Sequence, residues 1–157
     1  MAEFLIRGWN VAIPEVDVGD DIFVVQDEKG EIKRVQVKTA TAKEKKNGYS
    51  AQFNVQLKQI QNDTEIDLVY VFVVRNSDQW TKPVIISQNS LKDYFKKGKL
   101  GEDNNGMLNL HFSYSNEKVA CRGIDLSKYV SDFSEFPLAT RCLDDAEVKL
   151  RSRLHKK

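Results

Sequence analysis

Long apolar runs, a charge excess of one sign and clustered metal-binding motifs are all missing from this sequence. Lys and Arg number 24 and Asp and Glu number 23, so the net charge is +1 and no overall field steers the protein to nucleic acid or lipid. No run approaches the roughly 18 apolar residues that span a membrane, and the first residues lack the features of a signal peptide. We therefore expect a soluble cytoplasmic protein without a membrane partner, in which any nucleic-acid site is local.

Cysteine and histidine are too few and too scattered to predict a zinc site. Cys121 and Cys142 have no CxxC spacing, and His111 and His155 lie far apart in the sequence. The two cysteines could pair in an oxidising compartment, whereas in a cytoplasmic chain isolated thiols are more often plain core or surface residues. We favour the second interpretation.

Apolar patterns predict the secondary structure. The chain has 157 residues, 41% of them hydrophobic, which suits one domain. Strands are predicted at 9–13, 22–25, 35–38, 51–57, 68–74, 82–86 and 108–112, and helices at 3–7 and 90–97. The continuous run at 22–25 indicates a strand buried on both faces, and the run at 68–74 indicates a central strand. Polar segments predict a loop or exposed hairpin tip at 39–48 and a flexible loop at 101–106.

These elements predict an α+β domain with a mixed sheet over residues 1–140. A basic helix or tail is expected over 141–157. The sequence shows no internal repeat and no low-complexity linker that would divide the chain further.

The segment from Asp17 to Lys38 carries the most specific chemistry. The sequence DEKG, between the strands at 22–25 and 35–38, predicts a tight turn and therefore an antiparallel hairpin. Side chains two apart on a strand share a face, so Gln36 and Lys38 project together, and the hairpin brings Asp21 towards them. Asp21, the Gln36 amide oxygen and the Val37 backbone carbonyl are hard oxygen ligands of the kind that Mg²⁺ prefers. A lysine beside such a metal can hold the attacking water or stabilise charge on a phosphate.

The pattern D-x-G-x-D at Asp17, Gly19 and Asp21, followed by Q-V-K at 36–38, resembles the PD-(D/E)XK nuclease superfamily, including restriction endonuclease-like and Holliday junction resolvase-like members. The resemblance implies a restriction endonuclease-like core and a Mg²⁺ cofactor, for which Mn²⁺ can substitute. It further implies that Asp21 binds the metal, Gln36 occupies the D/E position and Lys38 is the catalytic lysine.

Two positions depart from the family pattern. Asp20 stands where the superfamily name has proline, and Gln36 is a neutral amide that binds Mg²⁺ less tightly than a carboxylate. Related nucleases often carry a glutamate on the first helix, and Glu3 is the candidate for that role. Each residue also has a plainer interpretation: Asp21 as a turn residue, Lys38 as an exposed strand lysine and Glu3 as a solvated helix residue.

Basic and aromatic residues outside the hairpin give weaker predictions. Lys43, Lys45 and Lys46 follow Lys38 and could contact a DNA backbone, although a run of charge is usually a solvated turn. The basic tail from 149 to 157 could touch nucleic acid or fray. Two tryptophans, at positions 9 and 80, are best taken as packing residues, although the second could stack on a base.

The sequence thus predicts a Mg²⁺-dependent endonuclease that hydrolyses phosphodiester bonds in DNA. The alternative is a catalytically inactive nuclease-fold module that binds DNA or a partner protein. A homodimer would suit an enzyme that cuts both strands, but the sequence does not decide the oligomeric state.

Overall fold

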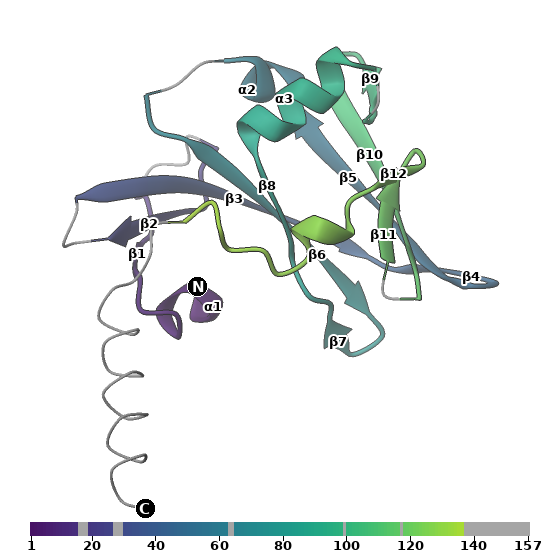
Figure 1. Ribbon diagram of the computed structural model, residues 1–157, viewed down its shortest axis with the longest axis horizontal. Coiled ribbons are helices and arrows are strands. Elements are labelled where there is room, and N and C mark those ends of the chain that lie inside the picture. The colour runs from purple at the N-terminus through teal and green to yellow at the C-terminus, as the bar shows by residue number, and fades with distance from the viewer. Residues whose placement is uncertain (16–18, 27–29, 63–64, 99, 117, 137–157) are drawn as a thin grey trace, which may run out of the picture.

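The computed structural model describes residues 1–15, 19–26, 30–62, 65–98, 100–116 and 118–136 (Figure 1). Asp17, Cys142 and the predicted basic segment 141–157 lie outside these residues. Among the helices described, none is long and apolar enough to cross a membrane.

A mixed sheet, sheet A, contains the predicted hairpin. Its order is β1 (Asn10–Ala12), β2 (Ile22–Gln26), β3 (Glu31–Thr41), β6 (Leu68–Asn76) and β7 (Gln79–Trp80), and β8 (Val84–Ser87) also pairs with β6. β2 and β3 are antiparallel and β3 and β6 are parallel, so the hairpin, the mixed sheet and the central position of residues 68–74 are confirmed. Gly30 has the positive φ of 66° that the turn sequence required.

An antiparallel sheet, sheet B, packs across sheet A. It runs β12 (Ile124–Asp125), β11 (Lys118–Cys121), β10 (Met107–Ser115), β5 (Gly48–Gln56) and β4 (Lys43–Lys45), with β9 (Glu102–Asn104) also pairing with β10. The β4 and β5 strands form a hairpin that projects beyond the rest of the fold at the right of Figure 1. The fold is therefore α+β, built on two sheets.

Helices are short and lie at the margins of the sheets. They are α1 (Ala2–Leu5), α2 (Leu57–Gln61), α3 (Gln88–Lys96) and a 3-10 turn, η1 (Ser127–Tyr129). The α3 helix begins at Ser87, whose hydroxyl oxygen accepts from the Ser90 N–H, and it ends before Gly98, which has a φ of 62°.

Two hydrophobic clusters cover the two faces of sheet A. The larger lies between the sheets, where Phe53, Phe72 and Phe112 meet edge to face with ring centroids 5.0 to 5.2 Å apart. The smaller packs Phe4 and Trp9 against the opposite face, so α1 lies on the other side of sheet A from α2 and α3 (Figure 1).

Several predictions about local structure were wrong. The strand at 22–25 is fully buried on one face only, because Phe23 and Val25 are half-buried. Residues 101–106 form β9 and its turn into β10 rather than a flexible loop, since β9 pairs with β10.

Three further boundaries and environments differ. In the segment 39–48, which was predicted as a loop or an exposed hairpin tip, the first three residues continue β3. The remainder belongs to the exposed β4–β5 hairpin. Leu57 begins α2 instead of ending a strand. Trp80 is 60% exposed rather than packed, while Trp9 is buried as predicted.

Candidate active site

The start of β2 joins the middle of β3 through a backbone bond and a side-chain bond of Asp21. The pairing of the two strands ends at Ile22 and Val35. Just beyond it, the Asp21 N–H donates to the Val35 carbonyl at 2.9 Å, and the Asp21 Oδ2 accepts from the Val37 N–H at 2.6 Å. A carboxylate thus takes the place of the next strand carbonyl, and this fixes Asp21 at the edge of β3.

Gln36 is the buried amide of the site. Its side chain is 7% exposed, and its Nε2 donates to the Gly19 carbonyl at 2.6 Å. The same carbonyl accepts from the Gln59 Nε2 at 3.0 Å. The Gln36 Oε1 is buried and accepts no hydrogen bond from any residue in the described part of the chain. Since such atoms are costly to leave unpaired, this oxygen has the capacity to bind an added donor or cation.

Arg34 and Asp20 form an ion pair on the same side of the hairpin. The Asp20 carboxylate accepts from the Arg34 Nε at 2.8 Å and from its Nη2 at 3.0 Å, and the Asp20 side chain is 4% exposed. A bidentate pair of this kind holds both groups in fixed positions. The Asp20 carboxylate is therefore occupied by this ion pair, which holds the Arg34 guanidinium in a fixed orientation.

A cavity of about 310 Å³ opens over these residues. Its lining is cationic and rich in amides: Arg34, Lys38, Lys58, Gln36, Gln56, Gln59, Asn62 and Gln88, with Gly19 and Leu68. No carboxylate is among the described residues that line it. An amide-rich pocket with several cations suits an anion such as a phosphate group.

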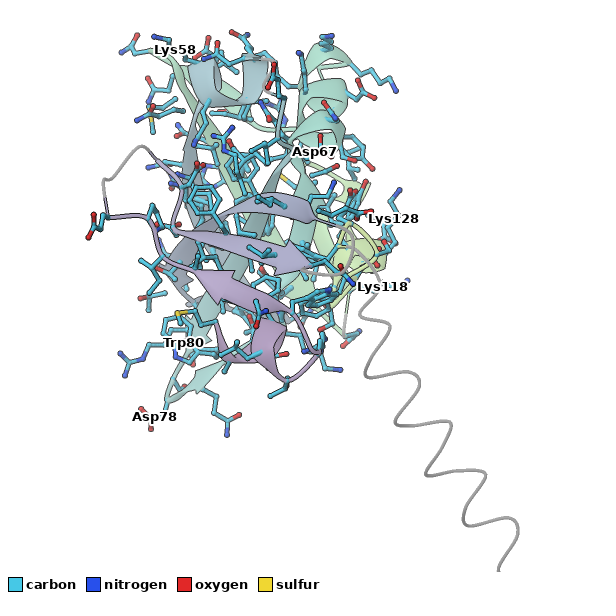
Figure 2. All side chains as sticks on the ribbon, turned by 90° about the vertical axis from the view of Figure 1, so that its left-hand side faces the viewer. Lys58, Asp67, Asp78, Trp80, Lys118 and Lys128 are labelled. Carbon is cyan, nitrogen blue, oxygen red and sulfur yellow. The ribbon has the colours of Figure 1, made fainter. Side chains whose placement is uncertain are left out.

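Gln88, in the first turn of α3, holds the end of α2 beside the cavity. Its Nε2 lies 2.7, 3.2 and 2.6 Å from the carbonyl oxygens of Gln59, Ile60 and Asn62, which share its two hydrogens. These carbonyls belong to the end of α2 and the residue after it, so one buried side chain satisfies groups that a short helix leaves unpaired. Lys58, on α2, lies at one end of the molecule, and Trp80 and Asp78 lie at the other end (Figure 2).

Tyr70 lies on β6 directly beside Gln36 in the parallel register. Its hydroxyl is buried and has no hydrogen-bond partner among the described residues. Burial raises the pKa of the Tyr70 phenol well above its usual value, so the group stays protonated and remains a donor at neutral pH.

The predicted residues are brought together only in part. Gln36 and Lys38 line the same cavity, and Asp21 contacts β3 between them, at Val37. Asp21 itself is exposed and is not one of the cavity's lining residues. Glu3 lies on α1, where its carboxylate contacts Arg7 Nη1 at 2.6 Å, on the far side of sheet A.

The predicted DNA-contact lysines lie away from the cavity. Lys43 and Lys45 are exposed on β4, and Lys46 is exposed in the turn that follows it. Lys43 and Lys45 line a second hollow, of about 550 Å³, together with His111.

Few of the residues here are of the kind that could hold a hard divalent cation. The described residues contain no group of three or more His, Cys, Asp or Glu that could hold a metal ion. The oxygens available are the Asp21 carboxylate, the unpartnered Gln36 Oε1 and the Val37 carbonyl, which shares a strand edge with the N–H that Asp21 accepts from. One carboxylate with neutral oxygens is a set that Mg²⁺ accepts when water and phosphate complete the octahedron.

Sequence reasoning missed several residues of this site. Arg34 shares a strand face with Gln36 and Lys38, so the alternation along β3 could have found it. No local signal pointed to Lys58, Gln59 and Gln88, because tertiary packing of α2 and α3 brings them to the cavity.

Comparisons with known proteins give a likeness in structure. No protein-family model matches the chain, and no curated protein matches its sequence. Among solved structures, it is similar to a bacterial homing endonuclease, I-Ssp6803I, with a TM-score of 0.49 and 17% identity over 94% of this chain and 88% of that chain.

Proposed function

We propose that this protein is a metal-dependent nuclease that hydrolyses phosphodiester bonds in DNA, with Asp21, Gln36 and Lys38 at its centre. The observation that carries the proposal is the buried, unpartnered Oε1 of Gln36, a residue that lines a cavity together with Lys38. The Asp21 carboxylate meets β3 at the residue between them. The acid therefore contacts β3 at Val37, between the positions of the amide and the lysine.

In this proposal Asp21, Gln36 and the Val37 carbonyl would hold Mg²⁺, for which Mn²⁺ could substitute. The bound ion would supply Lewis-acid stabilisation of phosphate charge and a more acidic bound water. The residues are hard oxygen donors, and the Val37 N–H bond orients the Asp21 carboxylate for this role.

The cations of the cavity act on the DNA phosphate directly. Lys38 orients the attacking water and stabilises charge on the phosphate as the bond to the leaving oxygen breaks. Asp20 holds Arg34 in a fixed direction, and Lys58 lines the same cavity from α2. Both can therefore bind phosphates of the DNA backbone beside the reacting one. Glu3 lies outside this centre because it pairs with Arg7 on the opposite face of sheet A.

A second candidate function is a nuclease-fold module that binds DNA or a partner protein without cutting. The observation that favours it is the shortage of acids in the described part of the chain, where Asp20 is paired with Arg34, Glu3 is remote, and Asp21 is the acid that contacts β3 at Val37. A binding module of this kind needs no affinity for divalent cations.

The experiment is cleavage of supercoiled and linear DNA by the full chain with Mg²⁺ or Mn²⁺. We expect Asp21→Ala and Lys38→Ala to lower the cleavage rate by at least about a hundredfold, because each removes a group from the reacting centre. Asp78→Ala and Lys96→Ala are matched controls at exposed positions, and they should keep the parent rate.

Two results would decide against catalysis at this site. Full activity in both centre variants would move the activity elsewhere. No cleavage by the parent protein, combined with no Mn²⁺ binding by titration, would favour the binding module.

A further inference from the structure

The solvent-facing side of the β5 and β10 strands is rich in amide side chains. Strand alternation points Ala51, Phe53 and Val55 into the core, and it leaves the residues between them on the outer face. The two strands pair Gln52 with His111 and Asn54 with Asn109. At the ends of this ribbon, Gln56 pairs with Met107 and Ser50 with Ser113.

We propose that this outer face is the surface with which the protein recognises duplex DNA, by entering the major groove. The inference rests on the proposed function for its choice of DNA as the substrate. For brevity we call the surface formed by Gln52, Asn54, Gln56, Asn109 and His111 the amide face.

The chemistry of the amide face matches base edges. Glutamine and asparagine can pair with adenine N6 and N7 through two hydrogen bonds, and the major groove, about 12 Å wide, admits a two-stranded ribbon. Strand neighbours lie about 4.8 Å apart, and same-face side chains about 7 Å apart along a strand, so the five side chains cover several base pairs. On the amide face the structure gives one internal side-chain bond, from Gln52 Nε2 to Asn54 Oδ1 at 3.4 Å, which leaves most of its donors and acceptors to solvent or ligand.

Charge around the amide face favours a polyanion. Lys43 and Lys45 flank it on β4, and Glu44 between them lies on the opposite side because it pairs with Tyr49, which packs against the core. Glu102, an acid on β9, pairs with Asn109 in register, but its carboxylate is 3.2 Å from Arg122 Nη1. The lysines are therefore placed for phosphate contacts beside the groove.

The amide face is continuous with the candidate active site. Gln56 lines the cavity that holds Lys38, while Gln52 and His111 line the second hollow with Lys43 and Lys45. A duplex lying along the ribbon would therefore reach from the β4–β5 hairpin to the cavity. This continuity gives recognition and cleavage one common substrate.

The test separates recognition from cleavage by working in EDTA. The full chain is used to select from a pool of DNA duplexes with a randomised centre, and affinities are then measured for a selected duplex and for the unselected pool. We expect selection of a defined sequence, bound at least about tenfold more tightly than the pool. Asn54→Ala and Asn109→Ala should remove most of that preference while changing affinity for the pool less than about twofold.

Two variants control for place and for charge. Gln79→Ala removes an exposed amide on β7, outside the amide face, and should leave the preference unchanged. Lys43→Gln with Lys45→Gln should weaken binding to all duplexes alike and reduce the salt dependence of binding by about one unit per lysine.

Three outcomes would overturn the proposal: no selected sequence, an unchanged preference in both asparagine variants, or equal affinity for an RNA duplex, whose major groove is too deep and narrow for this ribbon. Cleavage with Mn²⁺ is scored separately. A protein that selects DNA but never cuts refutes the nuclease and keeps this inference, and one that cuts without selecting does the reverse.

Discussion

Strand β3 has two halves with different neighbours. From Glu31 to Val35, which we call the closed half, it pairs with β2 along its whole length. From Gln36 to Thr41, the open half, it continues to pair with β6, but β2 has ended. In the described part of the chain, the side chain of Asp21 provides the next bond on the β2 side, to the Val37 N–H.

The difference between the two halves shows where a buried polar atom is left without a partner and could bind a ligand. In the closed half, Val35 is buried in the core and the Arg34 guanidinium is paired with the Asp20 carboxylate. In the open half, the Gln36 Oε1 is buried without one. Buried polar groups are normally satisfied, so an exception beside a cationic cavity marks the place where binding would recover the missing bond.

The largest effect is expected from breaking the ion pair of the closed half. Arg34→Met leaves the Asp20 carboxylate buried and unpaired, which should lower the free energy of unfolding by about 3 kcal/mol. Urea unfolding measures it. Lys33→Met is the matched control, because the neighbouring pair of Lys33 with Asp67 is more exposed and should contribute less than about 1 kcal/mol.

A double variant tests the cause. Asp20→Leu together with Arg34→Met removes both charges, so it should cost clearly less than Arg34→Met alone. An Arg34→Met protein as stable as the Lys33→Met control would show that the two halves do not differ as described.

A smaller effect is expected from changing the ligand of the open half. Gln36→Glu replaces a neutral oxygen with a carboxylate and should tighten Mn²⁺ binding about tenfold, measured by calorimetric titration of the full chain. Gln56→Glu is the matched control, since Gln56 lines the same cavity but is exposed. If both variants gain equally, general charge accounts for the gain and Gln36 is not a ligand.

Local patterns predicted the closed half and much of sheet A. The antiparallel pairing of β2 with β3, the strand at 68–74 and the helix at 90–97 each depend on neighbours in sequence, and all three appear in the structure. Sheet B was not predicted as a separate sheet. Its strands come from both sides of β6 in the sequence, and pairing between distant segments such as β5 and β10 leaves no local signal.

The open half shows the same limit at the level of the site. Alternation correctly predicted that Gln36 and Lys38 share a face. It could not predict that Asp20 would pair with Arg34 while Asp21 bonds to the Val37 N–H. The direction of each side chain depends on the backbone conformation just before β2, which the alternation does not define. Whether Asp21, Gln36 and Lys38 bind metal and catalyse hydrolysis stays a prediction.

The smallest effect is expected at Glu3, outside both halves of β3. Its carboxylate forms an exposed pair with Arg7 one helical turn away, and α1 packs on the face of sheet A opposite the cavity. Glu3→Ala should therefore change the free energy of unfolding by less than about 0.5 kcal/mol. The DNA cleavage rate should also stay within about twofold of the parent, because a carboxylate that does not reach the phosphate or the metal cannot contribute to the barrier. A loss comparable to that of Lys38→Ala would instead require α1 to reach the other side of the sheet, and the centre would then extend beyond the open half of β3.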